Sequence, residues 1–196
     1  MKIDLFIFNS NKFKEEEIIN RFQLRDDEIL PFKKIINEEV RKEKLVSYYL
    51  KKKLVGKYHI GEKGKPLSEN CYFNVSHSRG YILLAKCEEC PIGLDVELIR
   101  PVDDLLKQYV CNPEEYKYAK DYQKFYEIWT VKESIVKCTG EGIDIHPNKI
   151  PALPTNGKRI FLYDSFNTKT CKYENLMIAV TIKGNADFEI KSYLGI

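Results

Sequence analysis

Hydrophobic and polar positions follow two rhythms along the chain. Period-two alternation or short apolar runs predict strands, and helical spacing predicts helices. The predicted strands are 3–8, 71–75, 81–87, 92–98, 159–163, 170–173, 176–182 and 188–193. The predicted helices are 12–22, 38–55, 103–110, one that follows Asn112-Pro113-Glu114-Glu115, and one that contains 129–137 and ends at Gly140 or Gly142; 25–34 is a short helix or a loop. Such a mixture predicts an α+β protein.

The helix expected over 38–55 carries an apolar stripe that should pack on the core. We expect its members to be Leu45, Tyr48, Tyr49 and Leu54. Arg41 lies one turn before Leu45, at the edge of this stripe, where a guanidinium can reach into a cleft. The lysines of the helix are expected to face solvent.

Length and composition place the chain among globular proteins. It has 196 residues, 43% of them hydrophobic, which is enough for one large domain or two small halves. Each half can be interpreted as helices with three or four strands, which allows an internally duplicated architecture. The formal charge of +3 is too weak to indicate nucleic-acid binding, but it is compatible with an anionic substrate or an acidic partner.

Cysteine usage and the apolar runs bear on location. The run 3–8 is short, contains Asp4 and lacks a cleavage site of small residues, and no stretch is long enough to cross a membrane. We therefore expect a cytoplasmic protein whose six cysteines are reduced. Cys87 and Cys90 form a CxxC pair, but a structural zinc site needs a second pair. A hairpin tip is the expected role of this pair.

Two stretches carry acidic and basic residues in regular positions. In 93–97 an extended backbone places Asp95 and Glu97 on one face, and in 129–137 Trp129, Glu133 and Lys137 recur every fourth residue. Each has an ordinary interpretation, namely the solvated face of a strand and an exposed helical ion pair. Three carboxylates brought together, however, repel one another unless a cation lies between them.

Two further polar segments offer phosphate donors. Ser76-His77-Ser78-Arg79-Gly80 follows the strand 71–75, and a serine-rich turn is the equally weighted alternative. A Ser-His hydrolase is disfavoured because neighbours on an extended chain point to opposite faces. Gly64-Lys65-Pro66 predicts a turn that presents Lys65. It is not a nucleotide P-loop, since His59 and Pro66 stand where that motif needs glycine and serine or threonine.

Four motifs, taken in order, resemble the signature set of the Sfp-type (surfactin-synthetase-activating type) 4'-phosphopantetheinyl transferases. They are Gly64-Lys65-Pro66, Phe73-Asn74-Val75-Ser76-His77-Ser78, Gly93-Leu94-Asp95-Val96-Glu97 and Trp129-Thr130-Val131-Lys132-Glu133-Ser134-Ile135-Val136-Lys137. Arg41-Lys42-Glu43-Lys44-Leu45 is a looser match. The resemblance covers 64–137 well and the two ends of the chain poorly.

The resemblance implies a pseudo-dimer of two similar α/β halves, 1–91 and 92–196, with the active site in the cleft between them. It also implies Mg²⁺-dependent transfer of the 4'-phosphopantetheine arm from coenzyme A to a serine of an acyl or peptidyl carrier protein. Adenosine 3',5'-bisphosphate is then the second product. Neither nucleic acid nor a membrane is an expected partner, and internal duplication makes a monomer sufficient.

Residue by residue, the resemblance implies the following roles. Asp95, Glu97 and Glu133 are the metal ligands, and Glu133 is the base for the serine, directly or through water. Lys137 holds the pyrophosphate. The residues implied to bind the other phosphates of coenzyme A are Arg41, Lys65, Ser76 and His77.

Two alternatives remain open from the residues alone. One is another metal-dependent phosphotransferase or phosphodiesterase that uses the same three carboxylates, which would act without coenzyme A. The other is a non-enzymatic binder of an acidic partner through the basic helix 41–53. The choice among fatty-acid, polyketide and peptide-synthetase carriers is not encoded in any motif.

Overall fold

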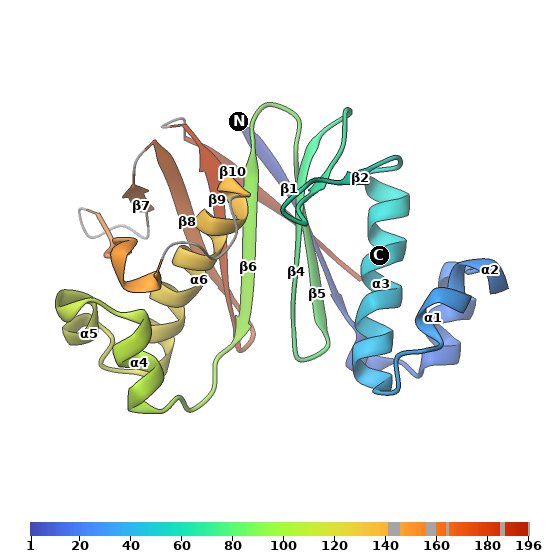
Figure 1. Ribbon diagram of the computed structural model, residues 1–196, viewed down its shortest axis with the longest axis horizontal. Coiled ribbons are helices and arrows are strands. Elements are labelled where there is room, and N and C mark those ends of the chain that lie inside the picture. The colour runs from blue at the N-terminus through green and yellow to red at the C-terminus, as the bar shows by residue number, and fades with distance from the viewer. Residues whose placement is uncertain (141–145, 156–159, 164, 185–186, 196) are drawn as a thin grey trace.

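The computed structural model describes residues 1–140, 146–155, 160–163, 165–184 and 187–195. It has the predicted α+β fold, with two four-stranded sheets side by side (Figure 1). The first sheet has the order β10-β1-β5-β4 and the second β6-β9-β8-β7. Their strands are β1 (Lys2–Asn9), β4 (Tyr72–Ser78), β5 (Tyr81–Cys87), β6 (Ile92–Leu98), β7 (Ile160–Tyr163), β8 (Phe166–Tyr173), β9 (Leu176–Lys183) and β10 (Glu189–Leu194). A small hairpin pairs β2 (His59–Ile60) with β3 (Pro66–Leu67).

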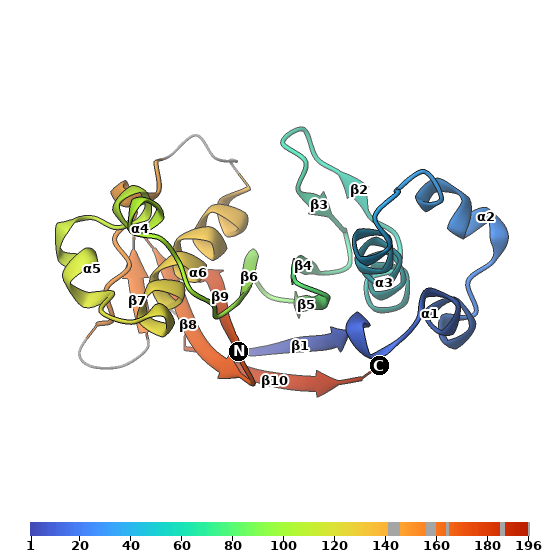
Figure 2. The same cartoon turned by 90° about the horizontal axis from the view of Figure 1, so that it is seen from below.

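Each sheet is covered by helices on one face. The helices are α1 (Glu15–Phe22), α2 (Asp26–Ile29), α3 (Glu38–Leu54), α4 (Asp104–Val110), α5 (Pro113–Tyr118) and α6 (Tyr122–Thr139). The first sheet is covered by α1–α3 and the second by α4–α6, with β4, β5 and β6 between the two groups (Figure 2). On the opposite faces, apolar residues of both sheets form a single cluster, which includes Leu5, Leu83, Leu94 and Val180. The two sheets therefore share a core.

Helix α3 packs on the first sheet through a stripe that matches the expected one only in part. Val46 and Leu50, with Leu45, take the fully buried positions. Tyr48 and Tyr49 are only partly buried because they face the neighbouring short helices. The Tyr49 ring stacks on Phe22 of α1, with 3.8 Å between centroids, and the Tyr48 hydroxyl donates to Glu28 of α2.

Helix α6 lies directly against the second sheet, and Gly93 of β6 makes this approach possible. A Cβ atom at Gly93 would lie 1.9 Å from the carbonyl oxygen of Ser134. The helix ends at Gly140 in the left-handed conformation (φ 74°), as one of the two expected ends predicts. The other candidate, Gly142, lies outside the described residues. The capping box at Asn112 and Glu115 is confirmed as the start of α5.

Several helices and strands begin or end at other residues than predicted, because contacts with distant segments set their ends. Ser10–Lys12 forms a 3₁₀ turn held to Gly80, so α1 begins at Glu15 and not at Lys12. Strand β4 continues to Ser78 because β5 pairs with it along this whole length, and β8 begins at Phe166 against β9. Strand β10 pairs in parallel with β1, which joins the two ends of the chain in one sheet (Figure 2). The division into 1–91 and 92–196 stays a prediction.

The segment with Cys87 and Cys90 is not the hairpin tip that the sequence pattern predicts. Strand β5 already pairs with β1 on one edge and β4 on the other, and β6 pairs with β9 in the second sheet. The segment instead connects the two sheets. None of the helices in the described part of the chain has the length and apolar character needed to cross a bilayer.

Candidate active site

The two sheets meet at a seam between β4 and β6, and side chains of β4 bridge it. Because alternate residues of a strand share one face, three polar side chains of β4 reach the backbone of β6. The N–H groups of Leu94, Val96 and Leu98 donate to Asn74 Oδ1, Ser76 Oγ and Ser78 Oγ over 3.2, 3.3 and 3.2 Å, respectively. This seam fixes how β6 presents its acidic residues.

The same two serines hold those acidic residues directly. Ser76 Oγ donates to Asp95 Oδ1 over 3.1 Å, and Ser78 Oγ donates to Glu97 Oε2 over 2.8 Å. Both serines therefore lie within β4 and point into the seam, although the sequence pattern predicts a polar segment after the strand. The serine-rich turn is thus excluded.

His77 points to the opposite face from Ser76, as extended backbone requires. Its Nδ1 lies 3.3 Å from Glu43 Oε2 of α3. Burial lowers the pKa of His77, while the neighbouring Glu43 carboxylate acts in the opposite direction. With two-fifths of its side chain exposed, His77 can still meet a ligand.

Asp95 is the most deeply buried of the predicted metal ligands. Its side chain is 5% exposed, and Oδ1 accepts from Lys137 Nζ over 2.5 Å. Its Oδ2 is buried and has no hydrogen-bond partner within the described part of the chain. Burial raises the pKa of Asp95 to about 7; Lys137 opposes this rise, and Glu97 and Glu133 add to it. The solvated-strand interpretation therefore fails for this residue.

Helix α6 brings Glu133 and Lys137 close to the carboxylates of β6. Burial raises the pKa of Glu133, Lys137 lowers it, and Glu97 raises it further. Trp129 Nε1 donates to Glu97 Oε1 over 3.4 Å, so this indole orients a carboxylate as well as packing. The three carboxylates and Lys137 thus share one electrostatic environment, and the exposed ion pair considered from the sequence is ruled out.

This donor set fits a hard divalent cation. Carboxylate oxygens are the protein ligands that Mg²⁺ prefers, and the unpartnered Asp95 Oδ2 is a free ligand atom. Burial raises the pKa of Asp95 and of Glu133, and neighbouring carboxylates raise both further, so a bound cation would stabilise their ionised forms. Within the described residues, no three acidic, histidine or cysteine side chains are already gathered into a coordination shell. The roles assigned to Asp95, Glu97 and Glu133 stay predictions.

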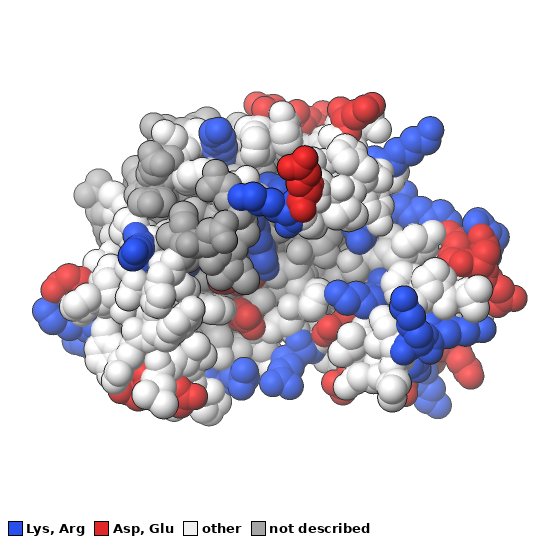
Figure 3. Space-filling model, viewed as in Figure 1, with Lys and Arg blue, Asp and Glu red and all other residues white. Residues whose placement is uncertain are grey.

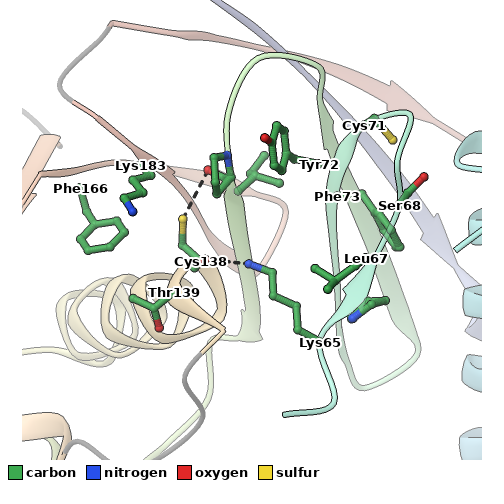
Figure 4. Close-up of a pocket in the computed structure, with 13 residues that line it drawn as sticks. Lys65, Leu67, Ser68, Cys71, Tyr72, Phe73, Cys138, Thr139, Phe166 and Lys183 are labelled. Atoms are coloured by element: carbon green, nitrogen blue, oxygen red, sulfur yellow. Dashed lines mark hydrogen bonds between the residues drawn. The ribbon is translucent and has the colours of Figure 1, made fainter. Parts of the chain in front are cut away.

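Lys65 lies on the β2–β3 hairpin and reaches across to the end of α6. Its Nζ donates to the carbonyl oxygen of Cys138 over 2.7 Å, and burial lowers the pKa of Lys65 (Figure 4). It lines a pocket of about 330 Å³ with Leu67, Phe73 and Lys183, among others. The predicted turn and its lysine are thus present, and the phosphate contact stays a prediction.

Arg41 is engaged within the first half of the chain. Its Nε donates to Glu15 Oε2 over 2.7 Å, and one terminal nitrogen donates to the carbonyl oxygen of Ile35 over 2.5 Å. The structure therefore ties Arg41 to α1 and the segment before α3. Its predicted phosphate contact would require these bonds to be given up.

Three residues with important contacts are absent from the set of site residues predicted from the sequence. Asn74 and Ser78 complete the seam, and the alternation of 73–78 around Ser76 was the signal that could have found them. Lys132 is the chain neighbour of Glu133 but points away from the seam. Its side chain is 1% exposed, and its Nζ lies 2.6 Å from Glu115 Oε2. No sequence signal distinguishes it from a surface lysine.

The molecular surface is hollowed between the side that carries α6 and the side that carries α3. Both acidic and basic side chains line this hollow (Figure 3). A substrate that carries phosphates as well as a metal ion would meet charges of both signs there. The hollow lies between the elements that carry the predicted site residues.

Comparisons with known proteins find similarity to 4'-phosphopantetheinyl transferases. A model of the 4'-phosphopantetheinyl transferase superfamily matches residues 91–184. The 4'-phosphopantetheinyl transferase HetI of Nostoc sp. is 30% identical over 65% of this chain and 61% of its own length. A putative 4'-phosphopantetheinyl transferase of Synechocystis sp. is 32% identical over 57% of this chain and 50% of its own length. The enzyme Sfp of Bacillus subtilis is 31% identical over 45% and 43%, respectively.

The chain spans about half the length of the curated relatives it matches. The segment matched by the family model begins just before β6 and contains Asp95, Glu97, Glu133 and Lys137. The segment 91–184, which carries these four residues, is therefore similar to the 4'-phosphopantetheinyl transferase superfamily.

Proposed function

We propose that this protein transfers the 4'-phosphopantetheine arm of coenzyme A to a serine hydroxyl of an acyl or peptidyl carrier protein. The observation that carries the proposal is the carboxylate cluster at the seam, where buried Asp95 contacts Lys137 and keeps an oxygen without a partner. Such a cluster suits phosphoryl-type transfer, which needs positioning and electrostatic stabilisation more than covalent catalysis.

Asp95, Glu97 and Glu133 would hold Mg²⁺. When bound, this ion neutralises negative charge that develops on the phosphate oxygens. The chain itself keeps the ligand oxygens in place: Ser76 and Ser78 donate to Asp95 and Glu97. These two hydrogen bonds fix the direction of each carboxylate before any substrate binds.

Glu133 is the proposed proton acceptor. The serine oxygen of the carrier forms a bond to the phosphorus of the pantetheine phosphate. The bond from that phosphorus to the oxygen shared with the adenosine bisphosphate breaks, and the serine proton passes to Glu133 directly or through water. Burial raises the pKa of Glu133, which makes its carboxylate a stronger base than an exposed one.

The basic residues are proposed to bind the phosphates of coenzyme A. Lys137 lies one turn after Glu133 and is about one-third exposed, so its ammonium group is accessible to the pyrophosphate. His77 is accessible from the other face of β4, and Lys65 lies at the pocket between the β2–β3 hairpin and α6. Ser76 and Arg41 complete the proposed set, although each already has protein partners.

We also propose that the protein acts in the cytoplasm as a monomer, with neither nucleic acid nor a membrane as partner. The apolar cluster shared by both sheets supports the monomer, since one chain builds both walls of the site. The small net charge of +3 agrees with a protein that does not bind nucleic acid through bulk electrostatics.

The test is incubation of the purified protein with Mg²⁺, coenzyme A and an apo carrier protein, followed by intact-mass measurement of the carrier. We expect the carrier to gain one phosphopantetheine group. Glu133→Gln should abolish the gain while the protein keeps its unfolding midpoint. Glu114→Gln, a matched change on the exposed face of α5, should leave both unchanged.

The outcomes separate this function from the two alternatives. Failure of every carrier tested to gain mass, beside a positive control enzyme that succeeds, would refute the proposal. Phosphotransfer or phosphodiester cleavage without coenzyme A would favour the other metal-dependent chemistry. Retained binding of an acidic partner by Glu133→Gln, with no transfer by the wild type, would favour a non-enzymatic binder.

A further inference from the structure

Three sulfur atoms meet at the end of the molecule where the N-terminus lies beside the connection between β5 and β6 (Figure 1). Cys87 ends β5, Cys90 follows three residues later, and Met1 precedes β1. Cys87 Sγ lies 4.0 Å from Cys90 Sγ and 3.6 Å from Met1 Sδ, and Cys90 Sγ lies 3.5 Å from Met1 Sδ.

These distances describe a triangle that can hold one metal ion. A point equidistant from all three sulfurs, the circumcentre of the triangle with these sides, lies about 2.1 Å from each. Metal–thiolate bonds are about 2.3 Å long, and sites within about 0.2 Å of the ideal length are plausible. The three sulfurs thus have the spacing of a trigonal coordination shell without any movement of the backbone.

We propose that Cys87, Cys90 and Met1 form a binding site for a soft monovalent cation, Cu(I). Thiolate and thioether sulfurs select soft ions of this kind. Zn²⁺ is not expected because it needs four ligands of thiolate, imidazole or carboxylate type. Within the described residues, no third histidine, cysteine or acidic side chain joins this pair to form such a group.

The chemistry of binding is an exchange of protons for a metal ion. Two S–H bonds break, two S–Cu bonds form, the Met1 thioether contributes a lone pair, and two protons pass to solvent with no change in oxidation state. Because two protons are released, binding should strengthen as the pH rises.

The surroundings allow a cation to enter. Cys87 is buried, whereas Cys90 and Met1 are only partly buried. A hollow of about 250 Å³ opens beside Cys87, and Glu88 and Glu89 on its wall are exposed. Asp4 lies on the same wall with Lys2 and Lys86, so the lining has a formal charge of −1, which admits a cation without concentrating it strongly.

The site is separate from the proposed active site. Its cysteines precede the first residue of β6, whereas Asp95 and Glu97 are the fourth and sixth residues of that strand. A bound ion would link the N-terminus of the first sheet to the segment that leads into the second. The proposal therefore does not depend on phosphopantetheine transfer.

The experiment is a competition for Cu(I) between the fully reduced protein, freed of thiol reductant without oxygen, and bicinchoninate, whose Cu(I) complex is coloured. We expect the wild type to withhold one equivalent from the chelator. Cys87→Ser and Cys90→Ser should each weaken binding at least about 100-fold, since loss of an outer-shell partner alone costs 10–100-fold. Cys171→Ser, the matched change in β8, should bind like the wild type.

Met1 is tested in a chain that carries an upstream tag, where Met1→Leu is possible. This variant should bind more weakly than the tagged wild type. The proposal is overturned if the wild type competes no better than Cys87→Ser and Cys90→Ser, or if all variants bind equally. Retention of Zn²⁺ through the same two cysteines with greater affinity would overturn the assignment to Cu(I). Unchanged unfolding midpoints for the variants confirm that a loss of binding is not a loss of fold.

Discussion

Lys132 and Glu133 are neighbours in one motif but face opposite sides of α6, and a substitution of Lys132 tests this division. Lys132 Nζ donates to Glu115 Oε2 over 2.6 Å and to the carbonyl oxygens of Val110 and Pro147 over 2.7 and 2.9 Å. Both side chains of the pair are 1% exposed or less. Lys132→Met keeps the length of the side chain and removes its charge.

The expected loss follows from what the substitution leaves behind. Glu115 would keep its bonds from the N–H groups of Asn112 and Ala152, but its charge would have no counter-ion in a fully buried site. Removing one partner of a buried ion pair costs about 3–5 kcal/mol. At about 2–4 °C per kcal/mol for a chain of this size, the midpoint of thermal unfolding should fall by roughly 6–20 °C.

The assay is urea and thermal unfolding followed by circular dichroism. Lys117→Met is the control, because the Lys117–Glu114 pair is about 70% exposed on both sides and should cost less than about 1 kcal/mol. The double variant Lys132→Met with Glu115→Gln should recover part of the loss, since it removes the uncompensated charge. An unfolding midpoint of Lys132→Met equal to that of Lys117→Met would refute the reasoning.

Three further predictions test the seam and its surroundings. Asp95 has a pKa of about 7 in the folded protein and 3.8 as an ordinary carboxyl. Between these pH values the folded state therefore binds one more proton than the unfolded state. The free energy of unfolding should fall as the pH rises through that window. Urea unfolding of wild type and Asp95→Asn at about pH 5 and about pH 8 measures this difference, and parallel changes in the two proteins would contradict it. Gly93→Ala should lower stability by about 1–3 kcal/mol because the new Cβ collides with the Ser134 carbonyl oxygen; an unchanged melting curve would show that α6 does not lie so close. Lys65→Met should raise the KM for coenzyme A more than it changes kcat, while loss of its bond to Cys138 costs less than about 1.5 kcal/mol of stability. An unaltered KM would remove Lys65 from the proposed phosphate-binding set.

Local structure was largely predictable from sequence. The strands 81–87 and 92–98 have the predicted bounds, and the helix expected over 38–55 differs by one residue. The capping residues before α5 and the glycine after α6 also act as predicted. These features depend on contacts within a few residues, which periodicity and capping chemistry report directly.

The carboxylates of β6 were assigned to one face from their alternation alone, and the helical spacing placed Trp129, Glu133 and Lys137 on one stripe. Neither pattern states which elements face each other. The seam that brings β4 to β6, the burial of Ser76, and the bonds of Arg41 to Glu15 and Ile35 arise from contacts between distant parts of the chain.

The sequence by itself determined the elements and the faces on which their charged residues lie, because side-chain direction in a strand or helix follows from backbone geometry. Only the tertiary structure decided which faces meet. Ser76 lies inside a strand because β5 pairs with β4 along its whole length. Cys87 and Cys90 lie beside Met1 and not in a hairpin, because β6 pairs with β9 and not with β5. The tertiary structure also showed that Lys132 is a buried structural residue, because burial depends on the packing of α5 and α6 and not on residue type.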